Sequence, residues 1–456
     1  MKAEKKVSHS KEEDAILIHQ LEGRPRLRTA VPLGLQHVLA MFTGNLAPIL
    51  IIASACGLGD GDIVIMMQSA MFVSGLTTFV QLYPIRIGKH FRIGGNLPIV
   101  MGTSFAFVPT ATSVAAMGGI GAVLAGSIVG SLAEVIIGFF YKWVRHLFPP
   151  LVIGCTLVTI GIDLLEVGAN YFAGGAGAAD YGSPQNIAIA TAVLLVIVLL
   201  QRFGKGLIKS TSILIGLIVG YLISLALNMV DVQSIAEASF FSVPRPLYFE
   251  LDFSVAAIVS FIPLYVFSGI DTIGSTSGVA MAAFDREATA EETSGAILAD
   301  ALGSTTAAIF NSLPNTAFGQ NVGIITMTGV VNKFCIATGA MVLMICGFLP
   351  KLGAVFSAVP YCVLGGAVIS VFGTIAINGI KMLARAGFSE RNVLIMSVTF
   401  ALGLGLSSMP EAVAQLPSVI QFFFSDPIAA TCLISVVLNV AFPEKKSTQE
   451  SGEKAS

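Results

Sequence analysis

The sequence contains little charge for its length. Only 11% of its 456 residues are Asp, Glu, Lys or Arg, whereas 55% are hydrophobic. Charged residues make up about a quarter of an ordinary soluble domain. A soluble fold of this size cannot remove so much apolar surface from water. The composition therefore excludes an ordinary soluble protein and indicates an integral membrane protein.

Several functional signatures are also missing. No run of basic residues suggests contact with nucleic acid. The first 29 residues lack the apolar stretch of a secretory signal peptide. The six cysteines are scattered without a CxxC pair or an adjacent His, so we expect reduced, buried thiols. No pairing of a nucleophile with a base is visible either. We therefore expect no metal, no cofactor and no enzymatic activity.

Apolar runs separated by polar residues occupy most of the chain. A helix needs about 20 mostly apolar residues to cross a bilayer, and fourteen runs are candidates for such helices. They lie near residues 30–54, 64–85, 94–112, 119–141, 147–167, 185–201, 207–229, 255–282, 294–310, 317–332, 334–350, 355–380, 391–409 and 424–442. We expect fourteen transmembrane segments embedded in a lipid bilayer.

The positions of the cations predict the orientation. If the amino terminus is cytoplasmic and the segments alternate, every Lys and Arg except Arg245 and Lys351 falls on the cytoplasmic side. Cytoplasmic loops of membrane proteins are enriched in these residues. The pattern predicts an even number of segments, with both termini cytoplasmic, in the cell (inner) membrane.

Two segments are interrupted by Gly and Pro. They cover residues 94–109 and 311–321, the third segment of the first seven and the third of the second seven. Interrupted segments at corresponding places in two halves indicate a transporter built from inverted repeats, with its site near the bilayer midplane. The alternative is a pair of kinked packing helices, because membrane helices tolerate Pro and Gly.

Three titratable residues inside segments are candidates for proton coupling. Asp271 and Asp300 are carboxyl groups at positions where charge costs at least about 2.5 kcal/mol, so a function is expected. Burial and a neighbouring carboxylate both favour the protonated form. Either Asp could instead cap a broken helix. His37 is either a hydrogen-bonded packing residue or a proton relay.

The interrupted segments also carry groups suited to a flat heterocycle. Gln320 and Asn321 are adjacent amides, each with donors and an acceptor for the edge of a ring. Phe105 and Phe318 could stack on its faces, with the hydroxyl of Ser104 beside it. The alternative for both Phe residues is core packing.

On these residues the chain resembles the nucleobase-ascorbate transporter family, also called nucleobase:cation symporters. The family signature is matched from Gln320 to Gly329 as QNVGIITMTG. Gln36-His37, Gly102–Phe105 and Leu298–Asp300 resemble other family motifs. The resemblance implies an all-α membrane protein of two inverted seven-segment repeats, usually a homodimer. Short antiparallel strands are implied in the third and tenth segments.

The resemblance also implies a core domain that carries substrate past a gate domain. The division is residues 1–29, cytoplasmic tail; 30–141, core (segments 1–4); 147–229, gate (5–7); 255–350, core (8–11); 355–442, gate (12–14); and 443–456, cytoplasmic tail.

The resemblance assigns roles to individual residues. Asp271 and Gln320 would hydrogen-bond the base, and Phe105 would stack on it. His37, Asp300 and Asn321 match positions that are important for binding or coupling in the family. Together with the residue chemistry, we expect Ser104, Phe318, Gly319 and Asn321 to complete the substrate site, and Asp300, Asp271, His37 and Ser275 to be the proton-coupling positions, with Asp300 and Asp271 carrying the coupling because Ser275 does not titrate. Two positions depart from the family: Asp271 stands where Glu is usual, and Ser275 where close relatives have Asp or His.

The implied activity is import of a purine nucleobase, with a proton as the coupling ion and elevator-type alternating access. Gln320 resembles the purine branch, and a small hydroxyl at Ser104 goes with acceptance of uric acid, so we expect uric acid and/or xanthine. A uracil symporter is the nearest alternative. A sulfate-type anion transporter and a channel are further alternatives.

Overall fold

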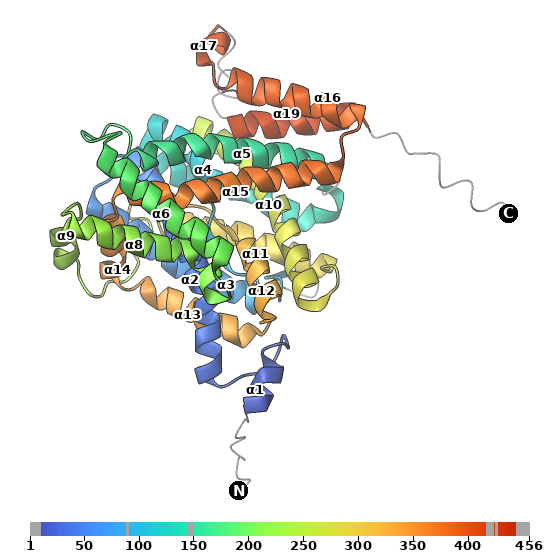
Figure 1. Ribbon diagram of the computed structural model, residues 1–456. Coiled ribbons are helices and arrows are strands. Elements are labelled where there is room, and N and C mark those ends of the chain that lie inside the picture. Colours follow the sequence, from blue (N-terminus) through green and yellow to red (C-terminus); the bar gives the residue numbers. More distant parts are fainter. Residues whose placement is uncertain are drawn as a thin grey trace.

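The computed structural model describes residues 11–87, 91–144, 147, 149–415, 424 and 427–443. Within these ranges the chain is mainly helical and has four short strands (Figure 1). The helices are α1 (Lys11–Leu17), α2 (Leu27–Ala55), α3 (Asp60–Leu82), η1 (Phe105–Phe107), α4 (Val108–Val144), α5 (Pro150–Phe172), α6 (Pro184–Phe203), α7 (Leu207–Ser210), α8 (Ser212–Ala226), α9 (Val232–Glu237), α10 (Val255–Phe284), α11 (Ala290–Ile309), α12 (Gln320–Thr328), α13 (Lys333–Cys346), α14 (Pro350–Ser357), α15 (Tyr361–Ala386), α16 (Glu390–Phe400), η3 (Ala401–Leu406), α17 (Pro410–Val413) and α19 (Pro427–Ala441). The strands are β1 (Ile85–Ile87), β2 (Phe91–Ile93), β3 (Met101–Thr103) and β4 (Asn315–Ala317).

Seven helices in the described part of the chain are long and apolar enough to cross a membrane. They are α2, α3, η1 with α4, α5, α6, α10 and α15. Helices α13 and α14, bent by 80° to each other, add an eighth if they are counted together. The expectation of a multi-pass membrane protein is confirmed. Fourteen crossings remain a prediction, because several expected segments form short or broken elements that length and composition do not identify as spans.

A glycine divides α4 at the expected boundary between the third and fourth segments. Gly119 has φ 67° and ψ −166°, and Phe140 near the end of α4 also departs from helical geometry (φ −103°, ψ 19°). A residue with a Cβ rarely adopts a positive φ, so glycine accommodates this break at low cost. The break separates residues 108–118, which follow β3 and η1, from the longer second part of α4.

The twelfth expected segment, 355–380, differs from the structure. Its first residues belong to the separate helix α14, and α15 begins only at Tyr361 and continues to Ala386. Pro360 immediately precedes α15 and disfavours helical geometry in the residue before it. A second unexpected element is the antiparallel hairpin of β1 and β2, in which Arg86 is opposite Arg92.

The helices pack in two groups. In one, α5 and α15 run side by side, with α6, α8, α16 and α19 around them (Figure 1). In the other, α4 packs along α10 and α11, while α13 packs along α2 and α3. Smaller contacts between α4 and α5, between α10 and α19, and between α2 and α8 connect the groups.

Glycines allow α2 and α13 to approach through their backbones. A Cβ on Gly34 would lie 2.1 Å from the carbonyl oxygen of Cys335, and one on Gly339 would lie 2.3 Å from the carbonyl oxygen of Gly34. Small residues at such contacts are typical of membrane helices, which associate through close packing rather than hydrophobic burial.

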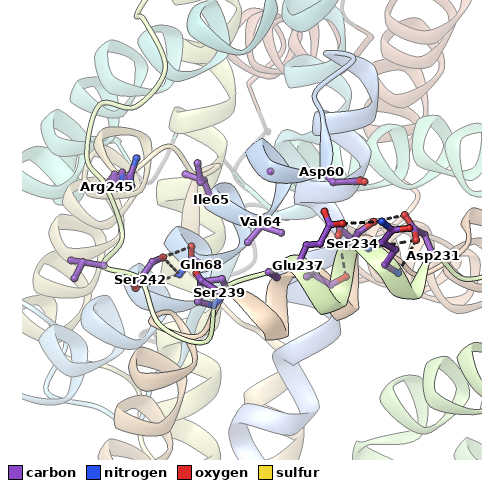
Figure 2. A pocket seen from close by; sticks show the side chains of 17 residues that line it. Asp60, Val64, Ile65, Gln68, Asp231, Ser234, Glu237, Ser239, Ser242 and Arg245 are labelled. Atoms are coloured by element: carbon purple, nitrogen blue, oxygen red, sulfur yellow. Dashed lines mark hydrogen bonds between the residues drawn. The ribbon is translucent and has the colours of Figure 1, made fainter.

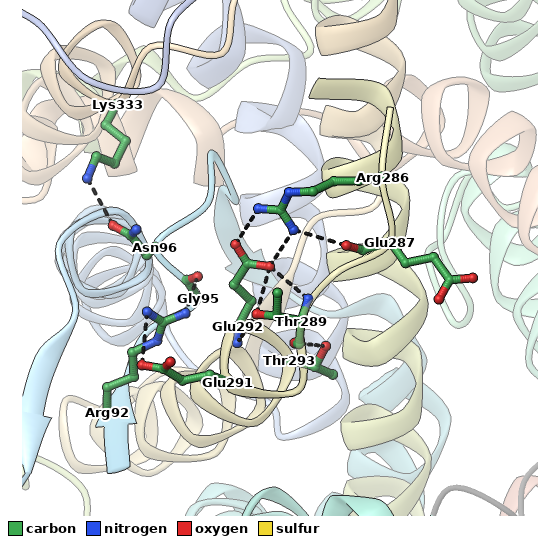
Figure 3. A network of polar contacts seen from close by, with 10 residues as sticks. All are labelled: Arg92, Gly95, Asn96, Arg286, Glu287, Thr289, Glu291, Glu292, Thr293 and Lys333. Atoms are coloured by element: carbon green, nitrogen blue, oxygen red, sulfur yellow. Dashed lines mark hydrogen bonds and ion pairs between the residues drawn. The ribbon is translucent and has the colours of Figure 1, made fainter. Parts of the chain in front are cut away.

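Ionic contacts connect the elements at one end of α11 (Figure 3). Arg286 Nη2 lies 2.6 Å from Glu292 Oε1, and Glu292 also completes a capping box with Thr289 at the start of α11. Arg92 of β2 forms an ion pair with Glu291 (Nη1 to Oε1, 3.3 Å). These contacts fix the start of α11 against the β1–β2 hairpin and the end of α10.

The segment before α2 docks on the junction between α12 and α13. Oδ2 of Asp14 accepts hydrogen bonds from Arg26 Nε (2.7 Å) and Thr29 Oγ1 (2.8 Å). Asn332 Nδ2 donates to the carbonyl oxygen of Leu17 (3.0 Å). Lys333 Nζ lies 2.5 Å from Glu22 Oε1. The amino-terminal segment is therefore attached at the end of α12, the helix that contains the family signature.

Candidate functional site

The two interrupted segments meet in a short antiparallel pair of strands. β3 pairs with β4 in the register Met101↔Ala317, Gly102↔Thr316 and Thr103↔Asn315. Hydrogen bonds continue the pairing on both sides, from Ser104 N to Pro314 O (3.0 Å) and from Phe318 N to Val100 O (2.8 Å). The expected short antiparallel strands are present, and all three residues of each strand are buried.

Buried polar side chains satisfy the ends of this strand pair. Asn45 Oδ1 accepts from the backbone N–H of Thr103 (2.7 Å). Asn315 Oδ1 accepts from Thr77 Oγ1 (2.6 Å), and its Nδ2 donates to Ser74 Oγ (2.7 Å). Strand edges in a bilayer have no water to pair with, so the protein must supply such partners. The network holds the irregular backbone in one conformation.

Two aromatic rings follow the strands directly. Phe105 is 7% exposed and packs edge-on against Phe372 of α15, with ring centroids 5.3 Å apart. The half-buried ring of Phe318 lies against Gly44 of α2, where an added Cβ would be 2.6 Å from Phe318 Cζ and 3.8 Å from Phe105 Cε2. The two predicted stacking residues therefore border the same place on α2.

Asp271 lies on α10 with its carboxylate available. It is partly exposed, and within the described part of the chain its side chain has no hydrogen-bond or ion-pair partner. Ser275 follows one helical turn later, and its Oγ would be 3.5 Å from a Cβ on Gly319. Gln320 begins α12, but its side chain lies outside the described residues. The polar face of α10 thus meets the start of α12.

Asp300 is fully buried on α11 and connects two elements of the site. Its Oδ1 accepts from the backbone N–H of Ala317 in β4 (2.8 Å), and its Oδ2 accepts from Ser268 Oγ of α10 (3.1 Å). Asp300 therefore connects α11 to the strand β4 and to the helix α10.

His37 and Asn321 form a buried pair. Nδ1 of His37 is hydrogen-bonded to Oδ1 of Asn321, and Nδ2 of Asn321 donates to the carbonyl oxygen of Pro98 (2.9 Å). Because Oδ1 of an amide is only an acceptor, Nδ1 of His37 carries the proton. Two residues singled out separately in the sequence are thereby in direct contact.

One buried acid was missed by the sequence reasoning. Glu134 of α4 is fully buried, close to Asp300 and to Gly269 of α10. The signal that selected Asp271 and Asp300, a carboxyl group inside an apolar segment, also applies to Glu134, which lies in the expected segment 119–141.

A cavity of about 550 Å³ lies elsewhere, between the start of α3, the α9 region and α14 (Figure 2). Gln68 donates to Ser242 Oγ (3.0 Å) on its wall, and Asp60, Asp231 and Glu237 give it acidic character. None of the predicted site residues lines this cavity. Among the residues that the structure describes, no cluster of three or more His, Cys, Asp or Glu could hold a metal ion.

Comparisons with known proteins identify the family and the fold. A family model described as "Permease family" matches residues 28–412. The xanthine permease of Bacillus subtilis (strain 168) is 35% identical over 428 residues, covering 92% of this chain and 96% of that protein. Xanthine permease XanP of Escherichia coli (strain K12) is 31% identical over 446 residues, covering 94% and 95%. Among solved structures, the transmembrane domain of the cyanobacterial bicarbonate transporter BicA has a TM-score of 0.61 at 15% identity, covering 90% of this chain and 97% of that chain. That likeness shows the fold.

Proposed function

Because this chain belongs to the nucleobase-ascorbate transporter family, we propose that it is a proton-coupled symporter that imports a purine nucleobase, xanthine and/or uric acid. Its relatives are permeases, so the chain is a nucleobase transporter and not an enzyme. The observation that supports the finer proposal is the β3–β4 pair, after which the rings of Phe105 and Phe318 both lie near Gly44 of α2 and Gly319 lies near Ser275 of α10.

The proposed substrate site uses groups with complementary chemistry. The carboxylate of Asp271 accepts from a ring N–H of the purine, and the amide of Gln320 completes the contact along the same edge. Phe105 and Phe318 pack on the faces of the ring. The backbone of Gly319 and the hydroxyl of Ser104 lie where each interrupted segment becomes helical, next to the bound base. Asn321 positions the start of α12 through His37 and Pro98.

Proton coupling is proposed for Asp300 and Asp271, assisted by His37 and Ser275. Asp300 supports this role through its contact with β4, because a change in its protonation alters a hydrogen bond to the strand that precedes Phe318. A proton is the only coupling ion required, and no other cofactor is proposed.

We also propose elevator-type movement of a core domain against a gate domain. The two packing groups of helices support this division, since α2, α3, α4 and α10–α13 pack together and α5, α6, α8, α15, α16 and α19 pack together. The proposed assembly is a homodimer in the cell (inner) membrane, with both termini cytoplasmic. The distribution of Lys and Arg supports this orientation.

Competition for uptake of labelled xanthine tests the substrate assignment. Cells that express this chain and lack other purine permeases should accumulate xanthine, and unlabelled uric acid should compete while uracil should not. Competition by uracil without competition by uric acid would instead support a uracil symporter.

The shared fold with a bicarbonate transporter raises an anion as a second cargo. Cationic side chains and helix N-termini both bind anions. In the described ranges Lys333 is the one buried Lys or Arg, and it is already paired with Glu22 and Asn96. A carboxyl group at Asp271, with no positive partner among the described residues, disfavours an anion at the same place.

A further inference from the structure

The carboxyl group of Glu134 accepts no hydrogen bond from the described residues. Its side chain is fully buried on α4, and neither Oε1 nor Oε2 has a hydrogen-bond partner in the described structure. Oε1 would lie 3.6 Å from a Cβ on Gly269 of α10, so the carboxyl group points between α4 and α10. An isolated buried carboxylate is strongly disfavoured, and an explanation is required for its position.

The group that faces Glu134 is another carboxyl. One turn before Glu134, Ser131 Oγ is hydrogen-bonded to Thr305 Oγ1 of α11 (2.7 Å), and one turn after it the carbonyl oxygen of Gly138 accepts from Ser294 Oγ of α11 (2.8 Å). Glu134 therefore lies on the face of α4 that packs along α11, at the level of Asp300. Asp271 and Tyr265 of α10 are the other titratable groups near it. Tyr265 is hydrogen-bonded to Ser127 Oγ (2.5 Å). Two carboxylates in contact repel each other, but a carboxylic acid donates a hydrogen bond to a carboxylate.

Within the described ranges, no buried Lys or Arg side chain is available to neutralise the pair. The buried residues in the described ranges that can carry positive charge are Lys333 and His37. Lys333 is paired with Glu22, and His37 is hydrogen-bonded to Asn321. The absence of a third ligating side chain among the described residues also disfavours a metal ion at this place. A proton is the ligand that satisfies both acids.

The hydrogen bonds indicate which acid carries the proton. Both oxygens of Asp300 already accept, from Ala317 N and Ser268 Oγ, which suits a charged carboxylate. Glu134 has no such donors, so its neutral form is the favoured one. We propose that Glu134 and Asp300 form a buried proton-binding site, in which protonated Glu134 donates its O–H to the carboxylate of Asp300.

This site is connected to the strand pair. Release of the proton would leave two neighbouring carboxylates, and movement of Asp300 away from Glu134 would alter its hydrogen bonds to Ala317 of β4 and Ser268 of α10. Proton occupancy therefore affects the strand before Phe318. The coupling role rests on the transport function proposed above, whereas proton binding itself does not.

Infrared spectroscopy of the purified full chain without substrate tests proton binding directly. Wild type should show the carbonyl stretch of a buried protonated carboxyl group at neutral pH. Glu134→Gln, whose amide can donate to Asp300 in the same way, should lose the intensity of one such group. Glu166→Gln, an exposed position on α5, is the matched control and should retain it. Full intensity in Glu134→Gln would overturn the proposal.

Transport measurements separate this proposal from the proposed function. In proteoliposomes, Glu134→Gln should lose accumulation of xanthine driven by a pH gradient but retain exchange of internal for external xanthine. The coupling role would be overturned if Glu134→Gln accumulated xanthine to the same level as wild type. It would also be overturned if a sodium gradient without a pH gradient drove accumulation by the wild-type protein. If wild type transports no nucleobase, the proposed function fails, and the infrared result still decides whether the acid pair holds a proton.

Glu134→Asp keeps the test decisive if Glu134→Gln does not fold. The shorter acid should retain a protonated band but shift the pH at which it disappears. An unchanged titration in Glu134→Asp would overturn the assignment of the proton to this residue.

Discussion

Oδ1 of Asp300 accepts a 2.8 Å hydrogen bond from the backbone N–H of Ala317. This contact joins a buried acid of α11 to β4, the strand that precedes α12. Asp300 therefore has a structural role in the site and is also a candidate for proton coupling. Substitutions that remove its charge must be distinguished from those that remove its hydrogen bonds.

Asp300→Asn and Asp300→Ala make this distinction. Asn retains an acceptor for Ala317, so we predict folding close to wild type with loss of proton-driven uptake. Ala leaves a buried N–H unsatisfied, which costs about 1–3 kcal/mol of stability. Thermal unfolding in detergent and xanthine uptake should be measured for both variants. Normal proton-driven uptake by Asp300→Asn would contradict the coupling role.

Gly44→Ala tests the place where the two rings meet. The new methyl group would lie 2.6 Å from Phe318 Cζ, so the ring must move. We predict a weaker apparent affinity for xanthine with the protein still in the membrane. Gly373→Ala in α15 is the control, because nothing lies within 4 Å of its added Cβ. Equal xanthine KM values for the two variants would show that Phe318 does not shape the site.

The pairing of His37 with Asn321 predicts energetic coupling. His37→Ala and Asn321→Ala should each lower the unfolding temperature, and the double variant should lose less than the sum of the two. Contacting residues typically show interaction energies of about 0.5–3 kcal/mol in such cycles. Additive losses would mean that the pair contributes no coupled stability.

The docked amino-terminal segment predicts a pH dependence. The hydrogen bond from Arg26 lowers the pKa of Asp14 from 3.8 to about 2. A carboxyl group with a depressed pKa stabilises the folded state above its unfolded pKa, and this contribution is lost as the pH falls through the folded pKa. The difference in unfolding temperature between wild type and Asp14→Asn should therefore be full above pH 3.8 and decrease toward about pH 2. Scanning fluorimetry in detergent checks it, and a difference that persists unchanged at the lowest pH would refute it.

Part of this site could be predicted from the sequence, because charge and chain breaks in an apolar segment are local signals. Gly and Pro identified the segments that contain β3 and β4, and burial of charge selected Asp271 and Asp300. Docking of the amino-terminal segment depends on long-range contacts, such as Asn332 with Leu17, which no local pattern reveals. Pro360 is a local signal for the turn before α15, but it lies within the continuous apolar run 355–380, which was expected to form one segment. The pairing of Glu134 with Asp300 required the packing of α4 on α11.

The proposed transport cycle depends above all on Asp271, which we propose to bind the purine during proton-driven import. The most direct measurement is accumulation of labelled xanthine in proteoliposomes under an imposed pH gradient, for wild type and Asp271→Asn reconstituted to equal density. We predict saturable uptake by wild type that a protonophore abolishes and uric acid inhibits, with no uptake by Asp271→Asn. Near-normal uptake by Asp271→Asn, or wild-type uptake that ignores the pH gradient, would contradict it.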